Sequence, residues 1–207
     1  VITYVCKHDN QTLFDNNAYK IPTGTSMDDR VRMQTLGLAF VMLGQGIPFV
    51  HMGAELLRSK SMQRDSYDSG DWFNVVDFTY QNNNWKVGLP REDKDGGNWP
   101  LIGQIFSDSS IAPTTTHIEA SKDEFLRLLR TRQSSILFRL RTAEQVKSRV
   151  MYHNTGPNQL PGLIVQTVSD ATCADAATDL DAQNDGLAIL INANDESQQF
   201  VMDGSSG

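Results

Sequence analysis

The segment VRMQTLGLAFVMLGQGIPFVHMG, residues 31–53, decides the fold. Its first part, residues 31–43, is apolar on nearly all sides, which predicts a buried helix. Gly44 and Gly46 are expected to end this helix. Residues 46–53 are continuously apolar rather than alternating, as in a parallel strand that is covered on both faces. The segment therefore predicts a buried helix that leads directly into a buried strand.

The residues before this segment complete a strand–helix–strand unit. Residues 1–6 (VITYVC) are mostly β-branched or aromatic and predict a short buried strand. Residues 10–24 contain several Asn, Pro and Gly residues and predict a loop. Thr25 or Ser26 can cap the helix, and the acidic residues that follow suit its first turn. The order predicts a βαβ unit with a right-handed crossover.

Residues 58–120 are long and irregular, and rich in Asp, Asn, Gly, Ser and aromatic residues. Long irregular segments in compact domains are usually functional or disordered. The aromatic residues argue against disorder. The sequence therefore predicts an ordered loop region at an active face.

Residues 121–140 predict an amphipathic helix, with a capping box formed by Ser121 and Glu124. Three apolar residues share its buried stripe and three arginines are expected outside it: Phe125, Leu128 and Leu129, and Arg127, Arg130 and Arg132. From residue 141 on, the short runs RVMYHN, GLIVQTV and GLAILINA are separated by turn residues and predict a small antiparallel β domain.

Composition excludes some classes of partner. The net charge is −7, which argues against nucleic acid because phosphate binding relies on clustered Lys and Arg. The longest apolar run, residues 36–50, is broken by glycines and a proline and falls short of the roughly 20 residues of a membrane-spanning helix. The two cysteines, Cys6 and Cys173, do not make a disulfide framework. Cys6 is expected to be a small buried apolar residue, and a disulfide between the two is left open.

Polar residues follow the first strand abruptly in YVCKHDNQTLFD, residues 4–15. Catalytic residues of parallel α/β barrels project from the carboxyl ends of the strands, and His8 and Asp9 stand at such an end. His51 and Arg58 follow the second strand in the same way. A capped turn with a local hydrogen bond is the alternative explanation of the His-Asp pair. His51, His117 and His153 lack the spacing of metal ligands, and His51 is expected to be a packed residue at the strand end.

Two motifs identify a family. KHDNQTLFD (residues 7–15) and RDSYDSGDWFN (residues 64–74) resemble the pullulanase group of the α-amylase superfamily, glycoside hydrolase family 13. Within this group of type I α-1,6 debranching enzymes, the resemblance is greatest to the large enzymes of Gram-negative bacteria, and it covers nearly the whole chain.

The resemblance implies a fold of class α/β plus β. Residues 1–140 would be the last two β/α units of a (β/α)8 TIM barrel, with a substrate loop at residues 58–120. Residues 141–207 would form an antiparallel β-sandwich domain that is truncated. The nucleophilic aspartate and the general-acid glutamate would precede residue 1, so the chain alone is expected to be inactive.

The resemblance also implies an activity. The parent enzyme would hydrolyse α-1,6-glucosidic branch linkages in pullulan, starch and related α-glucans by a retaining mechanism, which uses two carboxylates at the scissile bond. Asp9 matches neither of them. It matches a third carboxylate, which hydrogen-bonds the hydroxyls of the sugar in subsite −1 and stabilises the transition state. His8 would bind the same sugar, and Asn10 would lie beside it.

The second motif would supply the substrate loop, because carboxylates and amides suit sugar hydroxyls and aromatic rings stack on pyranose faces. Its implied substrate-binding residues are Arg58, Asp65, Tyr67, Asp71 and Asn74. The alternative is a solvated acidic loop with aromatics that pack onto the barrel, which is the expected role of Trp72.

The resemblance further implies a structural calcium ion and no organic cofactor. Two acidic clusters have the oxygen ligands that calcium prefers, although neither is an EF-hand: Asp65, Asp68 and Asp71, and Asp179, Asp181 and Asp185. The implied location is extracellular or at the cell surface of a Gram-negative bacterium. Two rival functions stay open: an isoamylase or glycogen-debranching type of enzyme, and a non-catalytic glucan-binding module.

Overall fold

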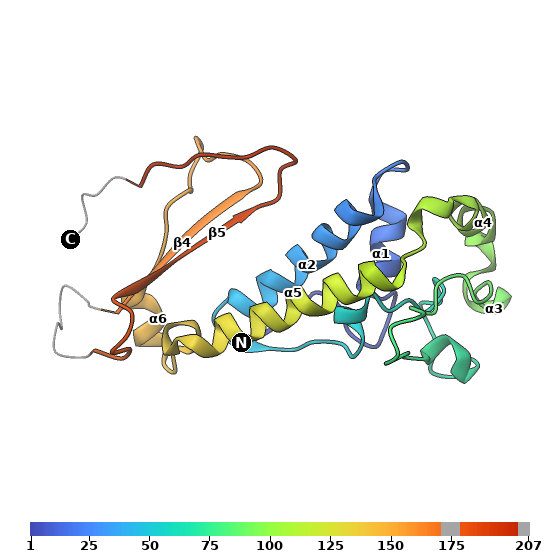
Figure 1. Cartoon of the computed structure of the whole chain (residues 1–207), viewed down its shortest axis with the longest axis horizontal. Helices are drawn as coiled ribbons and strands as arrows, with labels where there is room; N and C mark the ends of the chain where they lie inside the picture. The colour runs from blue at the N-terminus through green and yellow to red at the C-terminus, as the bar shows by residue number, and fades with distance from the viewer. Residues whose placement is uncertain (171–178, 203–207) are drawn as a thin grey trace. The chain divides into compact units, whose positions relative to one another are not determined.

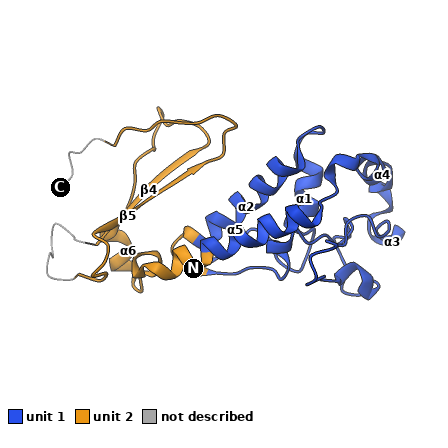
Figure 2. Ribbon diagram, in the orientation of Figure 1, with its two compact units in different colours: residues 1–42, 48–128 blue, residues 43–47, 129–207 orange. Residues whose placement is uncertain are grey.

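The chain forms two compact units in the computed structural model, which describes residues 1–170 and 179–202 (Figures 1 and 2). Unit 1 comprises residues 1–42 and 48–128, and unit 2 comprises residues 43–47 and 129–207. Cys173 lies outside the described residues, so its pairing with Cys6 is not tested. The predicted domain boundary at residue 140 stays a prediction.

The predicted central helix is confirmed. Helix α2 runs over Met27–Leu43, and Ser26 Oγ accepts a hydrogen bond from Asp29 N at 3.1 Å. Asp28 and Asp29 occupy its first turn, where the helix dipole favours negative charge. The capping residue is therefore Ser26, one of the two that the sequence offered.

The two strands predicted over residues 1–6 and 46–53 are shorter and more exposed than expected. They are β1 (Ile2–Thr3) and β2 (Ile47–Pro48), which pair in a two-stranded sheet, and Phe49 N donates to Thr3 O at 2.9 Å. Val1 is 99% exposed and Ile47 66%. The expectation of burial on both faces is wrong for this chain, because within the described residues no further strand or layer covers this small sheet.

Three helices differ from the sequence prediction. Helix α1 (Leu13–Lys20) lies in the predicted loop, because Thr12 caps it by accepting a hydrogen bond from Asp15 N. Helix α4 (Trp99–Ser107) lies in the predicted irregular region and begins with a proline in its first turn, a position that proline favours.

Helix α5 runs over Thr115–Ser134, so it begins six residues before the predicted start and ends before residue 140. The predicted capping box is wrong, since Ser121 is buried inside the helix. His117 supplies the cap instead: its Nδ1 accepts a hydrogen bond from Thr114 N at 3.0 Å. Short helical turns complete unit 1: η1 (Ala54–Leu56), η2 (Asp71–Asn74), α3 (Glu92–Asp95), η3 (Gly96–Asn98) and η4 (Ser109–Ile111).

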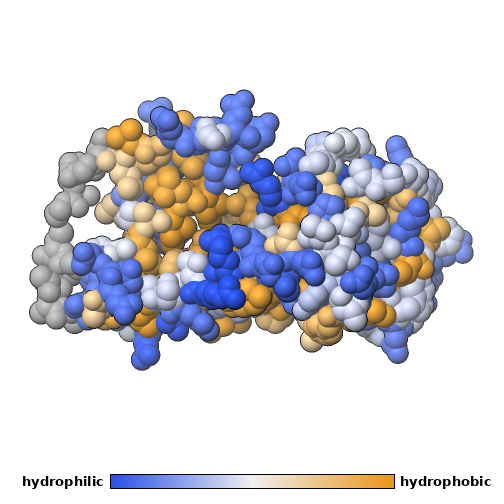
Figure 3. Space-filling view, viewed as in Figure 1, coloured by the Kyte–Doolittle hydropathy of each residue, from blue (hydrophilic) through white to orange (hydrophobic). Residues whose placement is uncertain are grey.

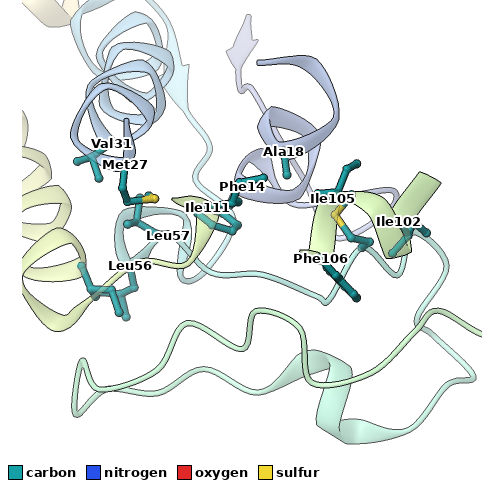
Figure 4. Close-up of a cluster of buried hydrophobic side chains, with 12 residues drawn as sticks. Phe14, Ala18, Met27, Val31, Leu56, Leu57, Ile102, Ile105, Phe106 and Ile111 are labelled. Atoms are coloured by element: carbon teal, nitrogen blue, oxygen red, sulfur yellow. The ribbon is translucent and has the colours of Figure 1, made fainter. Parts of the chain in front are cut away.

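One apolar cluster joins the helices of unit 1, and Figure 4 shows most of its side chains. Its members come from α1, α2, α4, α5 and the turns between them: Phe14, Ala18, Met27, Val31, Leu56, Leu57, Met62, Ile102, Ile105, Phe106, Ile111 and Ile118. The ring of Trp85 contacts Phe14 and Phe106 edge-on, with centroids at 5.3 and 4.9 Å. This cluster supports the loop residues 54–62, which lead to the site described below.

Unit 2 contains a three-stranded antiparallel sheet, as the sequence predicts. Its strands are β3 (Val150–Tyr152), β4 (Leu163–Ser169) and β5 (Gly186–Asn192), in the order β3-β4-β5. Figure 3 shows apolar residues gathered over β4 and β5. The described residues of this unit form one sheet, and the second sheet of a sandwich stays a prediction.

Two further helical elements lie in unit 2: η5 (Ile136–Arg139) falls within the end of the helix predicted over residues 121–140, whereas the sequence did not predict α6 (Ala143–Arg149). A capping box of Thr142 and Gln145 begins α6. At its end, Arg149 Nη1 donates to Asp170 Oδ1 at 3.1 Å, and both side chains are buried. This ion pair fixes α6 against the end of β4.

Arg132 is buried, although the amphipathic pattern of α5 placed it outside. Its guanidinium donates to the carbonyls of Gly44 at 2.8 Å and Gly46 at 2.7 Å. The last carbonyls of a helix have no partner within the helix, so they attract a cation with several donors. Arg127 and Arg130 are exposed, as predicted.

We expect Arg132→Ala to lower the free energy of unfolding by about 1–3 kcal/mol, because it leaves partly buried carbonyls without their donor. Arg130→Ala, at an exposed position of the same helix, is the matched control and should change stability by less than about 0.5 kcal/mol. Urea denaturation followed by circular dichroism measures both. Equal effects of the two variants would contradict the assigned role of Arg132.

Candidate functional site

His8 and Asp9 lie in an exposed bend, residues 7–10, between β1 and α1. Their side chains are 76% and 56% exposed, and His8 Nδ1 lies 3.2 Å from Asp9 Oδ1. The other carboxylate oxygen of Asp9 pairs with Lys7 Nζ. A pocket of about 260 Å³ lies beside the bend and is lined by Asp9, Asn10 and residues 4–7 and 11–13, together with Asn16.

Positive charges surround Asp9. The hydrogen bond from Lys7 lowers the pKa of Asp9 below its ordinary value, and the charges of His8, Lys7 and Lys60 act in the same direction. Asp9 is therefore a carboxylate at neutral pH. It can accept hydrogen bonds from hydroxyl groups, and it can stabilise positive charge on a bound molecule.

A buried carboxylate holds the segment behind this bend. Asp15, in the first turn of α1, is fully buried and accepts hydrogen bonds from Ser59 Oγ at 2.5 Å and from Lys60 N at 2.8 Å. Burial raises the pKa of Asp15, although these bonds and those from Thr12 and the backbone of Met62 act against the shift. The helix that follows the bend is thus joined to residues 59–62.

Residues 57–62, which we call the buried loop, have an unusual backbone. Leu57, Ser61 and Met62 have positive φ angles of 57°, 51° and 67°, and all three side chains are fully buried. Left-handed conformations are unfavourable for residues other than glycine and are found where the surroundings enforce them. Ser61 Oγ donates to Gly88 O at 2.6 Å, and Asn83 Nδ2 donates to Leu57 O at 2.8 Å. These contacts fix the conformation of the loop.

Arg58 lies inside the protein and is 7% exposed. Its guanidinium donates to Met52 O at 2.9 Å and to Asn74 O at 3.0 Å. Gly53 makes room for it, because a Cβ at this position would lie 2.7 Å from Arg58 Cδ. The structure thus brings together two predicted substrate-binding residues, Arg58 and Asn74, through the Asn74 backbone. A direct contact of Arg58 with sugar stays a prediction.

His51 lies next to Arg58, with Nε2 at 3.4 Å from Arg58 Nη1. Burial lowers the pKa of His51 from 6.5 to about 4, and the positive charges of Arg58, Lys60 and His8 add to the shift. The imidazole is therefore neutral at pH 7. Burial likewise raises the pKa of the nearby Cys6 thiol, so this layer beneath the bend holds neutral groups around one guanidinium.

Asp65 and Tyr67 lie in an acidic loop, residues 64–74, and Lys94 of α3 contacts both. Lys94 Nζ is 3.1 Å from Asp65 Oδ2 and 5.0 Å from the centre of the Tyr67 ring, which is 83% exposed. At the start of the loop, Arg64 Nη2 donates to Asn10 Oδ1 at 3.3 Å. The acidic loop is thus linked to the bend through Asn10.

The remaining predicted residues of the acidic loop are exposed. Asp71 begins the turn η2, and Asn74 ends it and accepts a hydrogen bond from Ser66 Oγ at 3.2 Å. Trp72 stacks on Phe73 with ring centroids 3.6 Å apart, which agrees with the expected packing role. The structure shows no direct contact between the 7–10 bend and Asp71, Tyr67 or Asn74 among the described interactions.

The acidic clusters do not fit a calcium site. Asp65 and Asp68 face Lys94 Nζ at 3.1 and 3.6 Å, so cationic side chains already occupy this position. In the other cluster, Asp181 accepts hydrogen bonds from Ser135 and Asn184. Within residues 1–170 and 179–202, no group of three His, Cys, Asp or Glu is placed to hold a metal ion. The family-implied calcium ion stays a prediction without a site.

Three residues of the site were not predicted from the sequence: Asp15, Lys60 and Lys94. Asp15 fell in the predicted loop, and the Thr12 cap was the signal that would have placed it in a helix. Lys60 and Lys94 gave no signal, because isolated lysines in a polar segment are usually solvated. Over the part of the chain that the structure describes, no helix has the length and apolar character to cross a membrane.

The chain is similar to proteins of one family. A family model described as alpha-1,6-glucosidases, pullulanase-type, C-terminal, matches residues 80–207. The chain is 53% identical over 169 residues to pullulanase 1, chloroplastic, of Arabidopsis thaliana, covering 82% of this chain and 18% of that protein. It is 47% identical over 198 residues to the pullulanase of Klebsiella pneumoniae, covering 96% of this chain and 18% of that protein.

A solved structure is also similar. The crystal structure of Klebsiella pneumoniae pullulanase complexed with maltotriose matches with a TM-score of 0.87 and 46% identity. The match covers 93% of this chain and 18% of that one. The chain therefore spans less than a fifth of the length of these relatives.

We expect the protein to lose stability as the pH falls from 6.5 towards about 4, in part through His51. In this range the unfolded chain binds a proton on His51 that the folded protein does not, so a fall in pH stabilises the unfolded state relative to the folded state. His51→Gln removes this proton and should lose less stability between pH 7 and pH 4.5. Melting temperatures at constant ionic strength measure the difference.

The control is His8→Gln, which removes an exposed imidazole from the same unit and should keep the loss of the unmodified protein. An identical loss of melting temperature in His51→Gln and the unmodified protein would show that His51 does not contribute.

Proposed function

Because the chain belongs to the pullulanase-type α-1,6-glucosidases, we propose that it is part of an enzyme that hydrolyses α-1,6-glucosidic branch linkages in pullulan, starch and related α-glucans. The resemblance stated for KHDNQTLFD and RDSYDSGDWFN is confirmed, since the relatives are pullulanases. The observation that carries the proposal is Asp9: an exposed, ionised carboxylate that is held with His8 in a bend fixed from behind.

The role of Asp9 follows from the charge that develops in the reaction. Glycoside hydrolysis passes through an oxocarbenium-like transition state, in which the sugar ring distorts and becomes positively charged. An anion that accepts hydrogen bonds from the hydroxyls of this sugar binds the transition state more tightly than the ground state. We assign this role to Asp9, with His8 and Asn10 on the same sugar in subsite −1.

The nucleophile and the general acid are proposed to lie in parts of the enzyme outside these 207 residues. The chain spans 18% of its pullulanase relatives, so the enzyme contains much more than the residues described. In the retaining mechanism one of these carboxylates attacks the anomeric carbon and the other protonates the leaving oxygen.

Two features support the proposed barrel and sandwich. The small sheet of β1 and β2 ends beside the bend and leaves large apolar side chains exposed, among them Val1, Ile2 and Ile47. Neighbouring strands of a (β/α)8 barrel would cover them, with β1 and β2 as its last two strands. The exposed Leu190 and Met151 share one face of the antiparallel sheet and suit coverage by a second sheet.

The acidic loop is proposed to bind further sugar units. Tyr67 presents an exposed ring, and Asp65, Asp71 and Asn74 present oxygens and an amide for hydroxyl groups. A solved relative is a complex with maltotriose, which supports α-glucan as the ligand class. Extracellular location stays a prediction, since one relative is named chloroplastic.

We expect Asp9→Ala, in the enzyme that contains this chain, to lower kcat on pullulan by about 10²- to 10³-fold, with a smaller change in KM, because it removes a group that acts mainly in the transition state. The release of reducing sugar from pullulan measures it. Asp123→Ala, an exposed carboxylate of α5 that pairs with Lys122, is the matched control and should keep full activity.

Substrate choice separates the rivals. Preferred cleavage of glycogen over pullulan would favour the isoamylase or glycogen-debranching type. Binding of maltotriose with no hydrolysis of either by the enzyme would favour a glucan-binding module.

The 207-residue chain alone should show no debranching activity, because Asp9 stabilises charge and does not make or break the bond. Purified chain is incubated with pullulan beside its own Asp9→Ala variant, and reducing sugar is measured. Activity of the unmodified chain above that of the variant would refute the proposed location of the nucleophile and the acid.

A further inference from the structure

Lys60 is a fully buried lysine that points toward the candidate site. Its side chain is 1% exposed, and its ammonium donates to the backbone carbonyl of His8 at 3.0 Å. Lysine is almost never fully buried unless its charge has a partner. Burial lowers the pKa of Lys60, and the negative charges of Asp15, Asp9 and Asp65 act against this shift.

Both ends of Lys60 are held. Its backbone N–H donates to the buried carboxylate of Asp15 at 2.8 Å. The next two residues, Ser61 and Met62, have left-handed backbones and fully buried side chains. The side chain therefore extends from a fixed point, and the position of its ammonium fixes the His8 carbonyl.

The target of this contact is the peptide unit between the two proposed site residues. The His8 carbonyl carbon is bonded to the nitrogen of Asp9, so the orientation of this peptide sets the direction of both side chains. His8 and Asp9 are themselves exposed, and the described ion pairs of their side chains lie within residues 7–9. Lys60 is the contact that ties this peptide to the interior among the described hydrogen bonds.

We infer that Lys60 is a positioning residue that holds the His8–Asp9 peptide in the orientation the reaction needs. The inference rests on the proposed function, because it assigns Lys60 a role in that same site. Lys60 touches neither substrate nor reacting atoms, and it acts through Asp9.

The test is a double-mutant cycle in the enzyme that contains this chain, with pullulan as substrate. Lys60→Met, which keeps the length and apolar stem but removes the donor and the charge, should lower kcat about 10- to 100-fold with little change in KM. In the Asp9→Ala background, Lys60→Met should cause a much smaller further loss, which leaves only its effect on His8, because residues that act through one another are not additive. Lys20→Met, an exposed lysine at the end of α1, should have no effect in either background.

Every outcome of this experiment either supports the positioning role of Lys60 or overturns it. An equal fold-loss in both backgrounds would assign Lys60 a general structural role and overturn the inference, as would unchanged kcat in Lys60→Met. If Lys60→Met does not fold by circular dichroism, the same cycle is run with Lys60→Gln, whose amide is polar but too short to reach His8. The proposed function fails separately, if the unmodified enzyme does not cleave pullulan or if Asp9→Ala leaves its activity intact.

Discussion

The carboxylate of Asp15 is the constraint on which the candidate site depends. It is buried, no cation contacts it among the described ion pairs, and it is held by donors from Ser59, Lys60 and Met62. A buried carboxylate is costly unless its oxygens are hydrogen-bonded, so the buried loop must take the conformation that supplies these donors. The left-handed backbones of Ser61 and Met62 are therefore part of the loop conformation that supplies hydrogen bonds to this buried carboxyl group.

Under this constraint, the residues that support the site are different from the residues proposed to act on a substrate. Arg58 and Lys60 are cations that point inward from the buried loop, and their partners are mostly backbone carbonyls. His8 and Asp9 are exposed, and Asp9 lines the pocket beside the bend. The exposed groups proposed to meet a substrate are thus free of the core, while buried, hydrogen-bonded groups beneath them set their positions. Preorganisation of this kind makes hydrogen bonds effective in a transition state, because they need not be rearranged during the reaction.

Local patterns in the sequence predicted the elements with strong periodicity. They placed α2, a cap at Thr25 or Ser26, and the strands of the antiparallel sheet, because each depends on residues close in the chain. The same patterns did not predict features that depend on contacts between residues far apart in the chain. Helix α1 is stabilised by contacts of Asp15 with residues 44 and 45 positions away, and Arg132 is buried because it meets carbonyls 86 and 88 positions away. The motif KHDNQTLFD identified the exposed His8 and Asp9. The buried Lys60, which contacts the His8 carbonyl, gave no pattern in the sequence.

The electrostatics of the bend restrict what Asp9 can do. A general acid in glycoside hydrolysis must hold its proton near neutral pH, which requires a raised pKa, as for a carboxyl group in an apolar pocket. Asp9 is in the opposite environment: a hydrogen bond from Lys7 and the charges of His8 and Lys60 lower its pKa. It is therefore an anion before substrate arrives, suited to accept hydrogen bonds and to face positive charge. A proton for the leaving oxygen must come from another group, which is why the proposed enzyme needs a carboxylic acid in a less polar setting than this bend.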